Sequence, residues 1–205
     1  MTLLALEFSS DRRSVALARG GVVLASAQQQ TESRATDALG LIEKVLAVAK
    51  ISRAEIEVIA VGLGPGSYTG IRAAIAVAQG WQLARGVKLL GVSSVEALAA
   101  QAQADKIFGR VQVAVNAQRG EFYLAAWEIS ADRRVEVLPL QIVPAAEVER
   151  RKAAGEIFLG ADFFPSAAAL AQLAAGRIDF VHGEDLTPVY LRETSFTKAA
   201  PVREF

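Results

Sequence analysis

The chain has 205 residues, of which 52% are hydrophobic, and its 22 basic side chains balance 22 acidic ones. This composition can fill a packed core, and the zero net charge lacks the basic excess typical of a protein that grips nucleic acid by itself. There is no cysteine and only one histidine, His182, so neither a disulfide framework nor a zinc site built from the usual ligands is available. We therefore expect one domain or two small lobes, without a bound metal.

Membrane and secretion signals are not found in the sequence. No apolar run reaches the roughly 20 residues that a membrane-spanning helix requires. The first four residues lack the basic start and the cleavage site of a signal peptide. The expectation is a cytoplasmic protein with no membrane contact.

The first half of the chain mixes short strands with helices. Apolar runs and helical repeats predict strands at 2–8, 14–19 and 22–27, a helix at 36–50, a strand at 58–61, a helix at 71–84, a strand at 87–91 and a helix from 94 to about 105. Gly20 and Gly21 fit a hairpin turn, and Ser93 with Glu96 fits a capping box for the last helix.

The second half repeats this outline. Strands are predicted at 110–115, 121–129 and 135–143, then a helix beginning at Pro144, a short strand at 157–160, a helix at 165–175 and a last short strand at 178–181. The repetition predicts an α/β protein of two similar lobes, each a mixed sheet flanked by helices. We place the first lobe at residues 1–105, the smaller second lobe at 106–190 and a C-terminal tail at 191–205.

A glycine-rich loop joins the strand at 58–61 to the helix that follows. Pro65 and Gly66 suit the second and third positions of a type II turn, and either Ser67 or Thr69 can cap the helix. Backbone N–H groups at such a helix start suit an anion, so Gly64, Gly66 and Ser67 are candidate cofactor-binding residues. The loop has neither the lysine of a Walker A motif nor the spacing of a dinucleotide fingerprint. A tight turn with no ligand is the alternative.

The helices at 36–50 and 71–84 are apolar over more than one stripe. The second carries Arg72 as its only charged residue and holds many alanines. A helix in a small soluble protein normally keeps a polar face. Both helices therefore need cover on a second side, either from another lobe or from a partner protein.

Four ordered motifs closely resemble those of the TsaB family, also called YeaZ. They are the segment 62–80, which is similar to the family's GPGSFTGxRxGxxxAxG signature, the GVSS segment at 91–94, the AQRGEFY segment at 117–123 and the PVYLR ending at 188–192. The resemblance covers nearly the whole chain. It implies a fold of the actin-like ATPase (actin/Hsp70/sugar-kinase) type.

The resemblance also implies a function. TsaB proteins are non-catalytic partners of TsaD, which transfers a threonylcarbamoyl group to the adenosine beside the anticodon of tRNAs that read codons starting with A. The ATPase TsaE binds across the pair, and TsaB alone often forms a homodimer through the surface that docks on TsaD. Contact with tRNA would then be indirect, through the complex. In the family this surface is formed by first-lobe helices, which implies Leu39, Ile42, Leu46, Ile71, Ile75 and Ala78 as interface residues. Burial of each in the core is the alternative.

The residues expected of an enzyme are incomplete. In related kinases an acid on the first strand and a second acid in the other lobe hold phosphate and metal; here the two places are Glu7 and Asn116, so the second acid is missing. Glu7 itself also fits a strand-end acid bonded to the neighbouring turn. A hydrolase lacks a Gly-x-Ser-x-Gly elbow. We expect no cofactor, and we keep two alternatives to a scaffold subunit: an ATP-binding, kinase-like enzyme that uses the glycine loop, and a homodimer with a role unrelated to tRNA.

Overall fold

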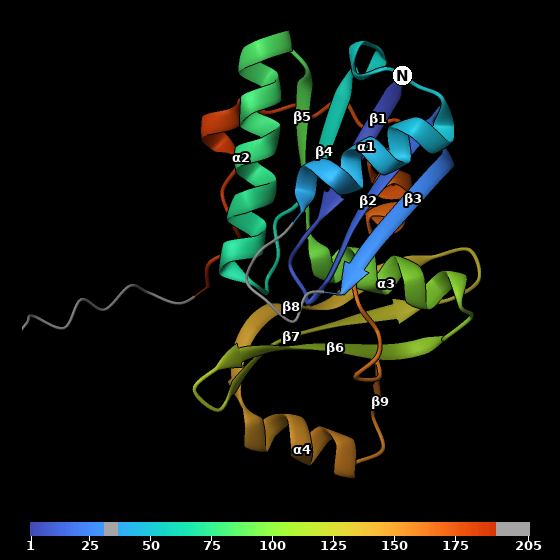
Figure 1. The fold of residues 1–205 in the computed structure, drawn as a ribbon. Helices are drawn as coiled ribbons and strands as arrows, with labels where there is room; N and C mark the ends of the chain where they lie inside the picture. Colours follow the sequence, from blue (N-terminus) through green and yellow to red (C-terminus); the bar gives the residue numbers. More distant parts are fainter. Residues whose placement is uncertain (31–36, 192–205) are drawn as a thin grey trace, which may run out of the picture.

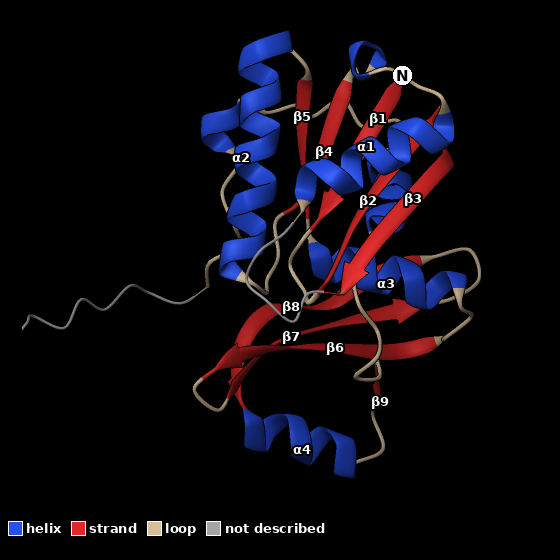
Figure 2. Ribbon diagram, in the orientation of Figure 1, coloured by secondary structure: helices blue, strands red, loops and turns tan. Residues whose placement is uncertain are grey.

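The computed structural model describes residues 1–30 and 37–191 and contains two β-sheets, of which the second lies across the strand ends of the first (Figure 1). Each sheet is mixed, and helices pack on its faces (Figure 2). The predicted α/β architecture of two similar lobes is therefore confirmed. Residues 192–205, which are most of the predicted tail, lie outside the described residues.

The first sheet has five strands in the order β3-β2-β1-β4-β5. They are β1 (Thr2–Glu7), β2 (Arg12–Arg19), β3 (Val22–Gln30), β4 (Val58–Gly62) and β5 (Lys88–Val92). β1, β2 and β3 form the predicted antiparallel meander, while β4 and β5 run parallel to β1. All six residues of β1 are buried, as expected for a strand covered on both faces.

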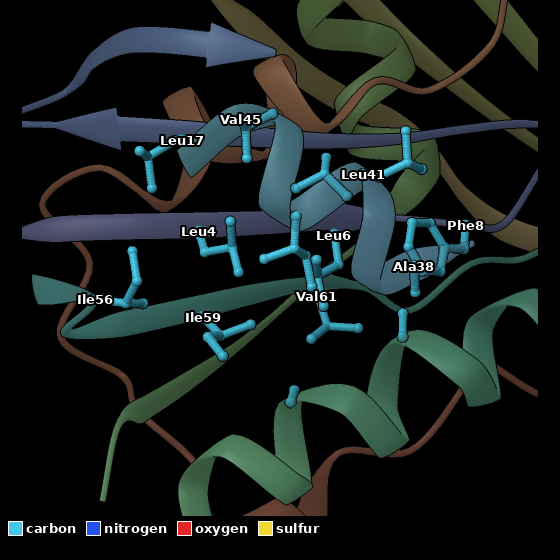
Figure 3. Packing of buried hydrophobic residues seen from close by; sticks show 14 of the residues in the cluster. Leu4, Leu6, Phe8, Leu17, Ala38, Leu41, Val45, Ile56, Ile59 and Val61 are labelled. Atoms are coloured by element: carbon cyan, nitrogen blue, oxygen red, sulfur yellow. The ribbon is translucent and has the colours of Figure 1, made fainter. Parts of the chain in front are cut away.

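Three helices cover this sheet. α1 (Ala38–Ala49) and α2 (Tyr68–Arg85) pack on one face, where their apolar residues join Leu4, Leu6 and Phe8 of the β1 segment in the largest core cluster (Figure 3). α5 (Ala167–Ala174) packs on the opposite face against alternate residues of β1 and β2. Because both faces are covered, the sheet forms the centre of a three-layer lobe.

The second sheet has four strands in the order β8-β7-β6-β9. They are β6 (Gly109–Gln118), β7 (Glu121–Ile129), β8 (Arg134–Pro144) and the two-residue β9 (Ile157–Phe158). An antiparallel meander followed by a parallel strand repeats the order of the first sheet. α3 (Ser94–Ala104) lies between the two sheets and contributes to both cores, and α4 (Ala145–Ala153) covers the outer face.

The C-terminal part of the described chain differs from the predicted repetition of the first half. α5 does not join the second sheet but returns to the first, where Ser14 Oγ accepts a hydrogen bond from Ala167 N at 2.9 Å. The segment 178–181 forms no strand of the second sheet; Val181 makes an isolated bridge to Leu89 of β5. Pro144 ends β8 and caps α4 rather than forming its first turn. The division of the chain at residue 105 stays a prediction.

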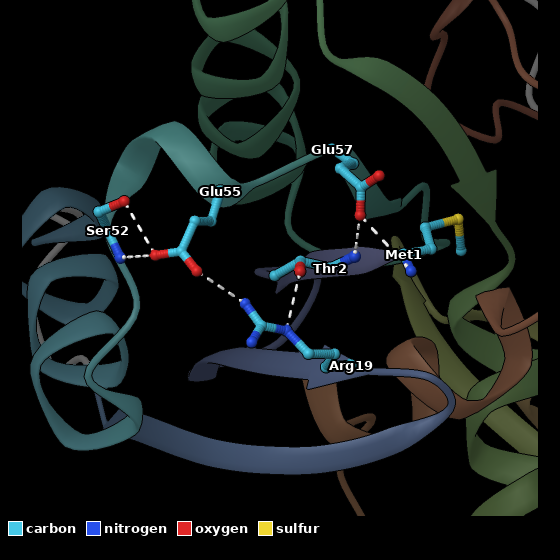
Figure 4. A network of polar contacts seen from close by, with 6 residues as sticks. All are labelled: Met1, Thr2, Arg19, Ser52, Glu55 and Glu57. Carbon is cyan, nitrogen blue, oxygen red and sulfur yellow. Dashed lines mark hydrogen bonds and ion pairs between the residues drawn. The ribbon is translucent and has the colours of Figure 1, made fainter.

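A polar network lies at the amino end of β1, far from the second sheet. Arg19 bridges Thr2 and Glu55, and Glu57 accepts a hydrogen bond from Thr2 N (Figure 4). Glu55 also belongs to a capping box with Ser52 at the short helix η1 (Arg53–Glu55), and these contacts lower the pKa of the Glu55 carboxyl. Such exposed ion pairs contribute little to stability, so the network mainly sets the geometry of the connection between α1 and β4.

In the part of the chain that the structure describes, no helix is long and apolar enough to cross a membrane.

Candidate functional site

A cavity of about 720 Å³ lies between the two lobes. Its first-lobe wall consists of residues 9–11, which follow β1, and residues 65–68, which lead into α2. Its second-lobe wall includes residues 113–118 of β6, residues 122 and 123 of β7, Val148 and Lys152 of α4, and the segment 158–165 except Asp162. Ligands of open α/β sheets bind beyond the carboxyl ends of parallel strands, and β1 and β4 end at this cavity. This cavity is therefore the first candidate for a ligand-binding or catalytic site.

The glycines of the loop between β4 and α2 are explained by packing within the chain. A Cβ on Gly62 would lie 2.1 Å from the Glu7 carboxylate, and one on Gly66 would lie 2.0 Å from the carbonyl oxygen of Ser9. The predicted type II turn is wrong, because Gly66 has φ +150° and the Gly64–Pro65 peptide bond is cis. These glycines let the loop lie directly against the end of β1.

The candidate cofactor residues are largely engaged in these contacts. Ser67 caps α2 as predicted, its Oγ accepting from Gly70 N at 3.3 Å, and its own N–H donates to Ser9 O at 2.7 Å. Gly64 N donates to Ser94 Oγ at 3.0 Å. Gly66 and Ser67 line the cavity, so they remain candidates, but the hydrogen bonds that the loop makes serve the fold.

Glu7 is the centre of a buried polar cluster at the ends of three strands. Its carboxylate accepts from Ser9 N at 2.7 Å and from Ser94 Oγ at 2.8 Å, and the residue is fully buried. The reading of Glu7 as a strand-end acid bonded to the neighbouring turn is confirmed. The capping box predicted at Ser93 and Glu96 is wrong, since Ser93 makes no side-chain cap and the Ser94 hydroxyl binds Glu7 instead. Glu7 thus joins β1 to the segments that follow β4 and β5.

Burial raises the pKa of the Glu7 carboxyl above its ordinary value of 4.5, while its hydrogen bonds from Ser9 and Ser94 act in the opposite direction. A carboxyl whose pKa is raised by folding stabilises the protein fully below its unfolded pKa, and this contribution is lost as pH rises through the folded pKa. We therefore expect the wild type to lose stability relative to Glu7→Gln as pH rises from about 4.5. Each unit by which the pKa exceeds 4.5 corresponds to about 1.4 kcal/mol.

Urea unfolding of both proteins at several pH values checks this expectation. Glu57→Gln is the control: Glu57 is exposed and hydrogen bonds lower its pKa, so its contribution is lost only on acidification. A free-energy difference between wild type and Glu7→Gln that stays constant with pH would contradict the prediction.

Five of the six predicted interface residues lie in the core of the chain itself. Ile42, Leu46, Ile71, Ile75 and Ala78 are at most 6% exposed and pack against the first sheet. Their assignment to an outward surface is corrected, because they form the stripes of α1 and α2 that face the sheet. Leu39 is 58% exposed and points away from it.

The outward sides of α1 and α2 carry a different set of residues. On α2, besides the exposed Arg72, this side carries small and apolar residues at helical spacing: Thr69, Ala76, Gly80 and Leu83. On α1 the exposed apolar residues are Leu39, Ala47 and Val48, and the charged Glu43 and Lys44 are exposed between them. A Cβ added to Gly80 would meet no atom within 4 Å. We call these seven small and apolar residues the outer helix face; sequence periodicity alone does not separate it from the buried stripes.

Comparison with known proteins places the chain. Residues 3–179 match the family model described as TsaD: tRNA N6-adenosine threonylcarbamoyltransferase. The protein named tRNA threonylcarbamoyladenosine biosynthesis protein TsaB from Escherichia coli (strain K12) is 32% identical over 128 residues, which are 62% of this chain and 55% of that protein. A protein of the same name from Bacillus subtilis (strain 168) is 28% identical over 166 residues, covering 79% of this chain and 72% of that protein. The match thus spans little more than half the length of the first of these relatives.

A solved structure agrees with these sequence matches. YeaZ from Pseudomonas aeruginosa superposes with a TM-score of 0.79 at 28% identity, over 93% of this chain and 99% of that one. The likeness therefore extends over both lobes.

Proposed function

Because the chain belongs to the TsaB/YeaZ branch of the TsaD-type family, we propose that it takes part in the synthesis of threonylcarbamoyladenosine in tRNA. In this proposal it is a non-catalytic subunit that binds TsaD and acts together with TsaE. It works in the cytoplasm and reaches tRNA only through the complex. The observation that supports binding to TsaD is the outer helix face.

The polar groups near the cavity support a role without catalysis. The acid that a kinase of this fold would use, Glu7, is fully buried and bonded to Ser9 and Ser94. Asn116 lines the cavity where a second acid would be required, and its Oδ1 accepts from Gln118 N at 2.7 Å. Within residues 1–30 and 37–191, no three acidic, histidine or cysteine side chains are grouped to hold a metal ion. A phosphate-transferring site therefore lacks its usual parts in the described chain.

The outer helix face supports a helix-packing partner. Its large apolar side chains are well exposed: the exposed fraction is 89% for Leu83, 66% for Val48 and 58% for Leu39. Ala76 and Gly80 have small side chains, or none, on the outward side of α2. Another helix can therefore approach closely and gain dispersion contacts. The same face would serve for pairing of two copies when TsaD is absent.

Reconstitution tests the proposal. TsaD, TsaE and the synthetase that supplies the threonylcarbamoyl adenylate, all from the same organism, are incubated with tRNA in the presence or absence of this chain. We expect the modified adenosine to form only when the chain is added. If the same amount of modified adenosine forms without the chain, the subunit role is wrong. The alternative of a homodimer with a role unrelated to tRNA would then be tested.

Ala76→Arg tests the docking surface. Ala76 is exposed in the middle of the outer helix face, so arginine is tolerated in the free protein but is left as a buried, unpaired charge in the complex. Such a charge costs about 2 kcal/mol or more, which corresponds to binding to TsaD that is about 30-fold weaker or more. Isothermal titration calorimetry with TsaD measures the change.

Ala153→Arg is the matched control, since Ala153 is also an exposed alanine of a helix but lies on α4 in the second lobe. It should bind TsaD like the wild type. If both variants bind normally, the outer helix face is not the docking surface; if both are weakened equally, the effect is one of charge rather than of site.

A further inference from the structure

β3 lies at the margin of the first sheet and has a long edge without a neighbouring strand. The order β3-β2-β1-β4-β5 gives it β2 as a neighbour on one side, and no segment of the described chain pairs with its other side (Figure 1). Residues 25–30 of β3 pair with residues 12–17 of β2 in unbroken register, and a bulge at Leu24 ends this regular stretch. A strand edge of this kind presents N–H and C=O groups that can pair with a further strand.

The other margins of the two sheets carry features that hinder such pairing. β8, at the margin of the second sheet, contains Arg134, Glu136 and Pro139. Charged residues and proline on an edge discourage the addition of a strand. β9 has only two residues, and β5 is bridged to Val181. β3 has nine residues with neither a charge nor a proline among them, so it is the least protected strand edge of the described chain.

The side chains along this edge leave space for a strand at its side. Ala25 and Ala27 point to the face beneath α1, where both belong to the largest core cluster. Ser26 and Gln28 point to the opposite face of the sheet and are exposed. These side chains bring no charge and no bulky apolar group to the edge. Pairing along β3 would therefore depend mainly on backbone hydrogen bonds.

A second copy of the same strand fits this edge. A two-fold axis perpendicular to the sheet pairs two identical strands antiparallel, so that residues of β3 lie opposite residues of β3. Like charges directly opposite one another destabilise a ladder, and β3 has no charge to place there. A strand of a different protein would be selected by charges or side-chain pockets along the edge. The uncharged residues 25–30 offer no charge for such selection, so the second copy is the occupant that they favour.

We propose that two copies of this chain pair antiparallel through residues 25–30 of β3 and join their five-stranded sheets into one continuous sheet. This edge lies in the plane of the sheet, whereas the outer helix face lies on the sides of α1 and α2 that point away from the sheet. The two surfaces are therefore distinct, and the pairing leaves the outer helix face available for another partner. The proposal does not rest on the role in tRNA modification.

Sedimentation equilibrium of the full-length chain tests the proposal. All proteins carry Ala76→Arg, which prevents pairing through the outer helix face. We expect this protein to form a dimer that the further change Ser26→Lys with Gln28→Lys weakens at least about tenfold, because like charges across an interface repel. A two-fold axis through residue 26, 27 or 28 places a lysine opposite a lysine in every case. As the matched control, Val137→Lys with Gln141→Lys adds the same charges to exposed residues of β8 and should leave the dimer unchanged.

A charge-reversal experiment shows whether β3 meets β3. Ser26→Glu with Gln28→Glu should weaken the dimer as the lysines do. Mixing the lysine protein with the glutamate protein should restore dimer formation, because opposite charges then lie across the two-fold axis. Recovery on mixing also shows that both proteins are folded.

Three outcomes would overturn the proposal. The Ala76→Arg protein could remain monomeric at all concentrations, which would leave the β3 edge for a strand of another protein. The dimer could persist unchanged when the lysines are present at residues 26 and 28. The loss caused by the lysines could fail to recover on mixing with the glutamate protein, which would mean that the two strands do not face each other. Loss in both charged proteins, recovery on mixing and an unchanged β8 control support the pairing.

Discussion

Gly70→Ala should destabilise the protein by about 3 kcal/mol, the upper part of the range for forcing extra volume into a packed interior. Gly70 lies in the first turn of α2, and a Cβ at this position would come within 2.0 Å of the carbonyl oxygen of Phe8. The Phe8 oxygen belongs to the backbone and the position of the Cβ is fixed by the backbone of α2, so relief requires the start of α2 to move away from the end of β1. That movement would also loosen the contact between Ser67 N and Ser9 O. Urea denaturation, read by circular dichroism, measures the loss.

Gly80→Ala is the matched control, because it places the same methyl group on the same helix. Gly80 has no atom within 4 Å of the added Cβ, so only the higher helix propensity of alanine counts. The variant should gain about 0.5–1 kcal/mol. If Gly70→Ala proved as stable as Gly80→Ala, the close approach of α2 to β1 would be wrong.

The role of the glycine loop shows where sequence reasoning stops. The order of strand, turn and helix and the cap at Ser67 were predictable, because they depend on residues close together in the chain. The reason for Gly62 and Gly66 was not predictable, because it depends on atoms of Glu7 and Ser9, more than fifty positions earlier. The same spacing that suits an anion also suits a loop pressed against a strand end.

The helix surfaces show a second limit. The sequence predicted that α1 and α2 have more apolar surface than one sheet face covers, and the structure confirms this by exposing Leu39, Val48 and Leu83. It did not predict which stripe faces inward. On α2, Ile71 and Ile75 fill the core, whereas Ala76 and Leu83 lie on the outward side. Periodicity fixes the relative positions of residues on a helix but not its rotation about its own axis.

The path of the chain after β9 depends on long-range packing. α5 is an alanine-rich apolar helix, and its sequence suits either sheet equally well. It packs on the first sheet because that sheet has a second apolar face to cover, formed by residues such as Leu3, Ala16 and Leu90. The return leaves the two-residue β9 as the only strand paired with β6 on that side within the described chain.

Gln112→Met is expected to raise the free energy of unfolding by about 1–3 kcal/mol. Gln112 is fully buried on β6, between Val111 and Val113, and therefore faces the opposite side of the second sheet, toward Leu124 and Val148 under α4. Neither the nitrogen nor the oxygen of its amide has a hydrogen-bond partner among the residues that the structure describes. Folding thus removes the amide from water without compensation, which costs about 1–3 kcal/mol for a buried unsatisfied group. Methionine fills nearly the same volume and carries no such cost.

Gln101→Met separates this effect from the substitution itself. The Gln101 amide is satisfied at both ends, donating to Phe164 O at 2.9 Å and accepting from Ser166 N at 2.8 Å. The same replacement there should therefore lower stability by about 1 kcal/mol, since two hydrogen bonds that hold the returning chain are lost. Thermal and urea unfolding of the two variants should shift in opposite directions. A loss of stability in Gln112→Met comparable to that in Gln101→Met would mean that the buried amide is hydrogen-bonded in solution, and that the interior beneath α4 admits a polar partner.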